Sequence, residues 1–326
     1  MNNLKHFRSN FFPTEKNHLL VISLFALFYI TWTSIVLGFR TDHQGFIIFI
    51  LTMCMLHRWT RTFAYSFVFF IIFWIIYDSL RAFPNYMLNP IHIIEPYNIE
   101  KFFFGISHNN DVITPNEYLK IHAHPVMDFL SGIFYLTWVP VPMALGIYLF
   151  FKDKKMLLHF SAAYLFTNFL GFIIYYSYPA APPWYFEKFG LKEYFNITGD
   201  AAQLVRFDNL IGYPLFENLY TKNSNVFAAI PSLHAAYPVV TWYYARKKKL
   251  RVASVFILVD IVGIWFSAVY SYHHYIIDII LGFLCAVLAI IIYETWLIKT
   301  GFQFVLDKYL AFVENKKTEN MLSKEL

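Results

Sequence analysis

Two short stretches of the chain place histidine beside groups that could activate it. They read Pro231-Ser232-Leu233-His234 and His273-His274-Tyr275-Ile276-Ile277-Asp278. His274 and Asp278 are four residues apart, so on a helix they share one face, and the carboxylate can hold one imidazole nitrogen while the other points at phosphorus. His273 is five residues from Asp278 and would lie on a different face. The two stretches together predict a membrane phosphotransferase in which His234, His274 and Asp278 are catalytic.

The pair of stretches resembles the second and third signature motifs of the type-2 phosphatidic acid phosphatase superfamily, whose patterns run P-S-x-H and S-R-x5-H-x3-D. Ser267 stands seven residues before His274, as the third pattern requires, but Ala268 stands where a phosphatase has arginine. No K-x6-R-P first motif occurs upstream, and its place is taken by Tyr178-Pro179-Ala180-Ala181-Pro182-Pro183-Trp184-Tyr185. This run of prolines and aromatics looks like the inositol phosphorylceramide synthase branch, a group of lipid head-group transferases.

These departures remove the basic residues with which a phosphatase holds phosphate. A diester phosphate still needs a fixed cation to stabilise its more negative transition state. We expect Arg206 and Arg81 to supply that charge, with Asp208 and Asp78 as further residues that bind the substrate or its phosphate. Asp78 lies near the outer end of an apolar segment, where a carboxylate is costly unless it is paired or functional. Ser232 and the backbone amides at the start of the following helix would hold phosphate oxygens.

The resemblance implies a reaction in two steps. His274 would attack the phosphorus of a phospholipid to form a phosphohistidine, and His234 would protonate the departing diacylglycerol oxygen and then act as base on the acceptor hydroxyl. By resemblance the donor is phosphatidylinositol and the acceptor is ceramide or dihydroceramide. Two alternatives stay open. One is a lipid phosphate phosphatase, in which water resolves the same intermediate, and the other is a non-catalytic lipid-binding membrane protein, which predicts a broken His or Asp.

The composition is typical of a polytopic membrane protein, because 58% of the 326 residues are hydrophobic and only 14% are charged. Six apolar runs are long enough to span a bilayer. They are predicted at 18–39, 62–80, 126–151, 156–178, 252–270 and 274–298, with shorter runs at 44–57 and 231–245. We therefore expect an all-α transmembrane helix bundle of about eight spans, of which 44–57 is short and uncertain. The resemblance implies a six-helix phosphatidic-acid-phosphatase-like core within it.

The distribution of charge predicts the orientation. If all eight runs cross, the termini share one side with the loops 57–62, 152–155 and 246–251. That side carries 18 Lys and Arg in about 61 residues, against 8 in about 105 residues opposite, so the positive-inside rule places it in the cytoplasm. The predicted organisation is a cytoplasmic N-terminus at 1–17, a membrane-embedded catalytic domain at 18–298 and a cytoplasmic tail at 299–326. The histidines then face the periplasm of a bacterium, or the lumen of a Golgi-like organelle in a eukaryote.

Neither a cofactor nor a metal ion is expected. The histidines of the loop 81–125 lack an ordered set of Cys, Asp or Glu, and the two cysteines have neither a C-x-x-C nor a zinc spacing. The net charge of +5 reads first as an orientation signal, so no nucleic-acid partner is expected. The expected partners are the phospholipid donor, the ceramide-type acceptor and the bilayer.

Overall fold

The computed structural model describes residues 16–195, 197–222 and 225–314. Most of the predicted N-terminal segment 1–17 and about half of the predicted tail 299–326 lie outside these residues. Regular structure in the described part is almost entirely helical, which confirms the predicted all-α class. Its strands are β1 (Ile106–His108) and β2 (Asp111–Ile113), which pair antiparallel in a short hairpin. The chain forms two compact units: residues 1–82, 148–161 and 298–326 make the first, and 83–147 and 162–297 make the second.

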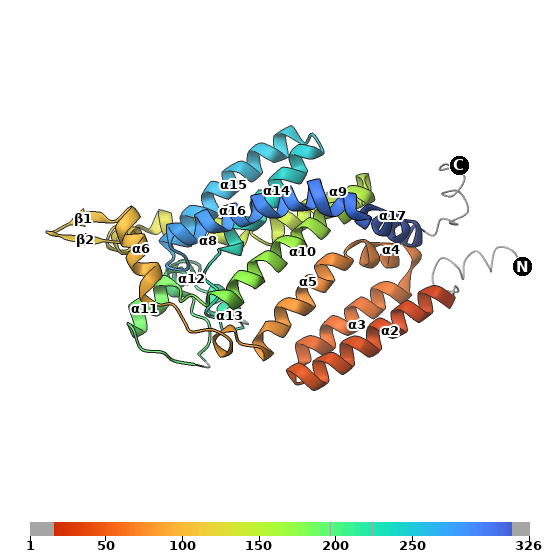
Figure 1. The fold of residues 1–326 in the computed structure, drawn as a ribbon, viewed down its shortest axis with the longest axis horizontal. Coiled ribbons are helices and arrows are strands. Elements are labelled where there is room, and N and C mark those ends of the chain that lie inside the picture. The colour runs from red at the N-terminus through yellow and green to blue at the C-terminus, as the bar shows by residue number, and fades with distance from the viewer. Residues whose placement is uncertain (1–15, 196, 223–224, 315–326) are drawn as a thin grey trace, which may run out of the picture. The chain divides into compact units, whose positions relative to one another are not determined.

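The first unit is built from apolar helices near the two ends of the chain. They are α2 (Lys16–Trp32), α3 (Thr41–Leu56), α4 (Arg58–Ser66), α5 (Val68–Ser79) and α17 (Phe302–Val313), joined by the adjacent ends of α9 (Pro140–Lys152) and α10 (Lys154–Ser177). Helices α2 and α3 lie side by side (Figure 1). Buried Ile22, Cys54, Tyr65 and Val313 bring α2, α3, α4 and α17 into one hydrophobic cluster.

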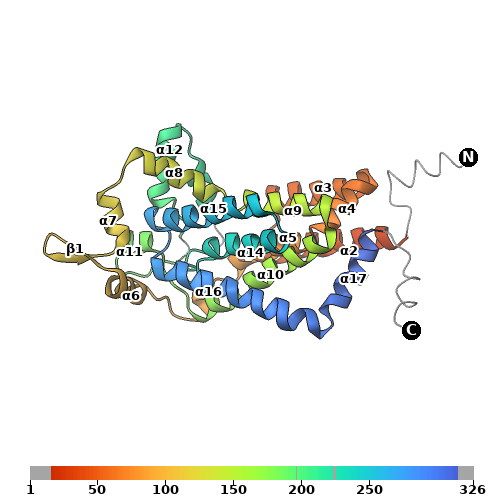
Figure 2. The same cartoon turned by 90° about the horizontal axis from the view of Figure 1, so that it is seen from above.

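The second unit carries both histidine stretches. Its helices are α6 (Ile94–Phe104), α7 (Pro115–Ile121), α8 (Pro125–Leu136), the remaining parts of α9 and α10, α11 (Pro183–Phe189), α12 (Val205–Ile211), α13 (Leu215–Tyr220), α14 (Leu233–Lys247), α15 (Arg251–Tyr270) and α16 (Ile276–Ile292). Helix α14 lies between α15 and α16 (Figure 2). The short helices gather at the end of this trio where α14 and α16 begin. Proline is the first residue of α7, α8 and α11, a position that suits its fixed φ and its missing N–H.

Five of the six long apolar runs each form one helix suited to a membrane, and the sixth forms a bent pair of helices. Five helices of the described chain are long and apolar enough to cross, and they lie at 18–37, 125–152, 154–177, 251–270 and 276–300. A sixth, at 58–82, is broken at Phe67, where α4 and α5 meet at a bend of 57°. The two short runs form α3, of 16 residues, and α14, of 15 residues. At 1.5 Å per residue each falls short of the ~30 Å hydrocarbon core, so length alone supports at most six spans, not eight.

Candidate active site

The structure brings the two histidine stretches into contact. Ser232 is the N-cap of α14, which places His234 in the first turn of that helix, and His274 lies in the short link between α15 and α16. Nδ1 of His234 lies 3.4 Å from Nε2 of His274. On its other side, Nδ1 of His274 lies 3.4 Å from Oδ2 of Asp278. The three side chains therefore form one row in which His274 is the middle member.

The predicted geometry of His274 needs one correction. Helix α16 begins at Ile276, so His274 does not share a helical face with Asp278 but precedes the helix that carries it. Asp278 reaches back toward the N-terminus of its helix, where its Oδ2 also accepts a hydrogen bond from the amide of Tyr275 at 2.9 Å. The pairing expected from a helical spacing is thus produced by a carboxylate that caps the start of its own helix.

His274 has the protonation state that a nucleophile requires. Its residue is only 5% exposed, and burial lowers its pKa to about 4, an effect that a hydrogen bond with the backbone of Ala229 offsets only in part. The imidazole is therefore neutral at pH 7. If Nδ1 carries the proton and donates to Asp278, the lone pair of Nε2 points toward His234.

The neighbouring His273 points to different partners. Its Nε2 lies 3.2 Å from the carbonyl oxygen of Ala201, and its ring stacks on Tyr220 at 4.2 Å and on Tyr135 at 5.5 Å between centroids. Burial lowers the pKa of His273 well below its ordinary value. His273 is therefore held as a neutral packing residue outside the row of His234, His274 and Asp278.

A close approach of α14 and α16 fixes the distance between the histidines. The amide of Ser232 donates to the backbone carbonyl of Asp278 at 2.9 Å, which joins the starts of the two helices. A Cβ added at Gly282 would lie 2.1 Å from the carbonyl oxygen of Ser232, so a residue with a side chain could not occupy that position without moving the helices apart. The hydroxyl of Ser232 accepts a hydrogen bond from the amide of Ala235 at 3.3 Å.

Two polar residues from the loop 81–125 hold the histidine link, and no motif in the sequence pointed to them. The carboxylate of Glu100, on α6, accepts hydrogen bonds from the amides of Ile276 at 3.0 Å and Ile277 at 3.1 Å. The amide nitrogen of Asn116, on α7, donates to the carbonyl oxygens of Val269 at 2.8 Å and His274 at 3.0 Å.

Both residues are fully buried. Burial raises the pKa of Glu100 to about 7, against the opposing effect of the two amides that it accepts. Glu100 and Asn116 therefore fix both ends of the segment that carries His274, from elements that precede it by more than 150 residues.

Arg206 pairs with a different carboxylate from the one that its sequence neighbours suggest. Its Nε lies 2.7 Å from Oδ1 of Asp128 on α8, and its guanidinium lies 4.8 Å from the ring centroid of Tyr270. The hydroxyl of Tyr270 donates to the same carboxylate at 2.7 Å. The Nη2 group of Arg206 donates no hydrogen bond to any described residue. Phe207, the next residue, belongs to the same hydrophobic cluster as Ala235 at the start of α14, so α12 packs beside the histidine site.

Asp208 does not pair with Arg206, and a role for Asp208 in binding phosphate stays a prediction. Residues two apart on a helix do not face each other. The two carboxylate oxygens of Asp208 accept hydrogen bonds from the amides of Phe216 and Glu217, each at 3.0 Å. Asp208 thereby caps α13 and fixes the turn between α12 and α13.

The other predicted pair, Asp78 and Arg81, belongs to the first unit. Asp78 is the centre of a cluster in which its carboxylate lies 2.8 Å from Nη2 of Arg81, 2.8 Å from Nε2 of His43 and 3.2 Å from Nη2 of Arg40. Arg40 also forms a two-point ion pair with Asp42. The carboxylate near the end of an apolar segment is thus fully paired, and a role for Asp78 and Arg81 in binding phosphate stays a prediction.

The segments that replace the phosphatase motifs lie against the histidine link. Ala268 is fully buried in the cluster that contains Ala235, and its carbonyl oxygen accepts the amides of His273 at 3.1 Å and His274 at 3.0 Å. The amide of Trp184, in the proline and aromatic run, donates to the carbonyl of Tyr272 at 3.1 Å. Within the described residues, no group of three or more His, Cys, Asp or Glu side chains is arranged to hold a metal ion.

Comparison with known proteins assigns the chain to a family. The profile of the PAP2 superfamily matches residues 112–292, which include every member of the histidine row. A phosphoinositol dihydroceramide synthase of Bacteroides thetaiotaomicron is 42% identical over 306 residues, which cover 93% of this chain and the full length of that protein. No solved structure matches the chain at a significant level.

Fungal relatives match over a shorter region. The inositol phosphorylceramide synthase of Candida albicans is 31% identical over 179 residues, covering 52% of this chain and 36% of that protein. The catalytic subunit of the same enzyme from Saccharomyces cerevisiae is 30% identical over 135 residues, covering 40% of this chain and 31% of that protein. The chain belongs to the PAP2 superfamily, within its inositol phosphorylceramide synthase branch, and is an integral membrane enzyme that acts as a lipid phosphotransferase.

Proposed function

We propose that this enzyme transfers phosphoinositol from phosphatidylinositol to ceramide or dihydroceramide. The observation that carries the proposal is the 42% identity to a phosphoinositol dihydroceramide synthase over the full length of that protein. The replacement of the phosphatase arginine by the buried Ala268 supports transfer over hydrolysis.

The proposed chemistry uses the row of three side chains in two displacements at phosphorus. The two imidazoles must start in opposite protonation states, with His274 neutral and His234 an imidazolium. Nε2 of His274 attacks the phosphorus, the bond from phosphorus to the diacylglycerol oxygen breaks, and the imidazolium of His234 donates a proton to that oxygen. His234 then takes the proton of the acceptor hydroxyl, whose oxygen attacks the phosphohistidine and breaks the bond between phosphorus and nitrogen. Asp278 holds the ring of His274 and stabilises the positive charge that develops on it. The phosphoryl group must enter between His234 and His274, so their nitrogens must separate from 3.4 Å as the donor binds.

The groups proposed to bind the phosphate oxygens are the guanidinium of Arg206 and the backbone amides at the start of α14. Arg206 has Asp128 as its single ion-pair partner among the described residues, and its Nη2 donates no hydrogen bond there. The helix after Ser232 presents backbone amides at its N-terminus beside His234. Together they would replace the cations of the phosphatase motifs.

The active site is proposed to open on the side of the membrane opposite the cytoplasm. The support is the charge asymmetry of 18 against 8 Lys and Arg, which is counted with α3 and α14 crossing as two short spans beside the six long ones, and which then places both histidine stretches on the less basic side. Lipid substrates would then reach the site laterally from the outer leaflet.

Purified enzyme with phosphatidylinositol labelled in its inositol separates the proposed reaction from hydrolysis. In the presence of ceramide, the label should move to a ceramide product while diacylglycerol is released. Without an acceptor, little label should leave the donor. Release of water-soluble inositol phosphate at the same rate with and without ceramide would instead identify a lipid phosphatase.

A further inference from the structure

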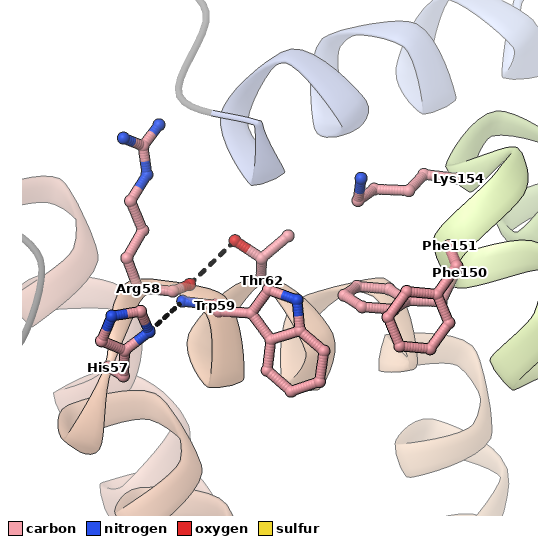
Figure 3. Close-up of a pocket in the computed structure, with 7 residues that line it drawn as sticks. All are labelled: His57, Arg58, Trp59, Thr62, Phe150, Phe151 and Lys154. Carbon is pink, nitrogen blue, oxygen red and sulfur yellow. Dashed lines mark hydrogen bonds between the residues drawn. The ribbon is translucent and has the colours of Figure 1, made fainter.

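A cavity in the first unit lies between the turn that joins α3 to α4 and the turn that joins α9 to α10. Its volume is about 350 Å³. It is lined by His57, Arg58, Trp59, Thr62, Phe150, Phe151 and Lys154 (Figure 3). The residues 125–152 and 154–177 form consecutive candidate spans, so the turn between them lies at a surface of the bilayer. The cavity is therefore at the level of lipid headgroups, and none of its residues takes part in the reaction proposed above.

The polar part of the cavity has an excess of positive charge. Figure 3 shows the side chains of Arg58 and Lys154 on the two sides of Trp59 and Thr62. Arg58 is exposed and forms no ion pair within the described residues. The ammonium group of Lys154 lies 5.3 Å from the ring centroid of Phe150 and 3.9 Å from the carboxylate of Glu314. The lining thus carries two cations and no carboxylate, with Glu314 as a long ion-pair partner of Lys154, and the site favours an anion.

The apolar part of the cavity is exposed although it is aromatic. Trp59 is 48% exposed and Phe151 is 61% exposed, and the centroids of their rings lie 5.9 Å apart. Behind them, the buried Phe150 contacts the edge of Trp59 at 5.5 Å and holds it in place. Exposed aromatic rings beside cations at the end of a span are the side chains that proteins use at the membrane interface. A water-soluble anion would not account for these rings, whereas a lipid would.

We propose that this cavity binds an anionic phospholipid, with Arg58 and Lys154 on its phosphate and Trp59 and Phe151 against the first carbons of its acyl chains. A volume of about 350 Å³ suits a headgroup and leaves the acyl chains in the bilayer. With α3 and α14 crossing as short spans, the positive-inside pattern assigns the loops 57–62 and 152–155 to the cytoplasmic side and the histidine stretches to the opposite side. The lipid bound here is therefore distinct from the donor lipid, and its binding does not depend on the identity of the transferred head group.

Quenching of tryptophan fluorescence tests the proposal. Full-length protein in nanodiscs of phosphatidylcholine is titrated with phosphatidylglycerol brominated in its acyl chains, and the signal of Trp59 is the difference between wild type and Trp59→Phe. Half-maximal quenching of that signal should need about tenfold less phosphatidylglycerol than brominated phosphatidylcholine. The double variant Arg58→Gln/Lys154→Gln should lose this preference, and each single variant should lose part of it.

A matched control removes two charges from the same predicted side at another place. Lys249→Gln/Arg251→Gln, in the exposed turn between α14 and α15, should keep the wild-type preference. Equal weakening in both double variants would show a general effect of surface charge and would overturn the proposal. So would equal quenching by the two lipids, an unchanged signal in Trp59→Phe, or displacement by glycerol phosphate as effective as by unbrominated phosphatidylglycerol. Size-exclusion profiles of all variants establish that they are folded before titration.

Discussion

Replacement of Asn116 by alanine tests whether the loop 81–125 takes part in catalysis through the backbone of His274. The change removes two hydrogen bonds to buried carbonyl oxygens, those of Val269 and His274. At about 0.5–1.5 kcal/mol each, their loss should lower the free energy of unfolding by about 1–3 kcal/mol. One of the two bonds fixes the nucleophile itself. If the free energy of the bond to His274 is lost from the transition state, kcat should fall roughly two- to tenfold while KM for the donor changes little.

Asn85 provides a control of the same chemistry. It is also fully buried, and its amide nitrogen donates to two carbonyl oxygens, those of Tyr175 and Phe227, each at 2.8 Å. Asn85→Ala should therefore lose similar stability but keep kcat near that of wild type. The assay is transfer of labelled inositol phosphate to ceramide, with thermal unfolding measured on the same preparations. If both variants lost stability equally and kcat equally, Asn116 would be a structural residue only, and the reasoning would fail.

Three further predictions follow from the site. Turnover should fall by about 10²–10⁴-fold in each of the variants His274→Ala, His234→Ala and Asp278→Asn, whereas the loss in His273→Ala should be much smaller. An equally severe loss in His273→Ala would mean that the nucleophile is misassigned. The pKa of Glu100 is raised from 4.5 to about 7 in the folded state, so its contribution to stability is complete below pH 4.5 and is lost as pH rises through 7. The melting temperature of Glu100→Gln minus that of wild type should therefore increase over this range. The exposed Glu95→Gln is the control, and a pH-independent difference for Glu100→Gln would contradict the prediction. In a protein without its two native cysteines, a membrane-impermeant maleimide added outside intact cells should label a cysteine at position 222 and not one at 248, and the reverse pattern would invert the proposed orientation.

The spans and the histidine row could be predicted because their signals are local in sequence. An apolar run of about twenty residues can satisfy its backbone in a bilayer only as a helix, and five of the six long runs each form one such helix while the sixth forms a bent pair. The spacing of His274 and Asp278 indicated their contact, although the reason differs, since His274 precedes α16 and Asp278 reaches back to it. A four-residue spacing cannot distinguish these two arrangements, because both bring the side chains together.

The supports of the site could not be predicted because their partners are distant in sequence. Glu100 lies in an ordinary amphipathic segment, and its amide partners are 176 and 177 residues away. The nearest carboxylate to Arg206 in the sequence is Asp208, whereas tertiary packing gives it Asp128 on another helix. The capping box at Thr114 and Glu117 marks the start of α7 and is readable in the sequence, but it does not tell where the buried Asn116 points.

The bonds from Glu100 and Asn116 have a consequence for constructing hybrids between members of this branch. A loop between membrane spans is usually regarded as an exchangeable module, so the loop 81–125 would be a natural segment to transplant from a relative with different lipid preferences. Here the buried side chains of Glu100 and Asn116 form hydrogen bonds with the main chain at Val269, His274, Ile276 and Ile277. Main-chain acceptors and donors are present in every relative, but their positions depend on the local course of the chain. A functional hybrid therefore has to take the segments 81–125 and 267–278 from the same protein, because each determines the position of the other.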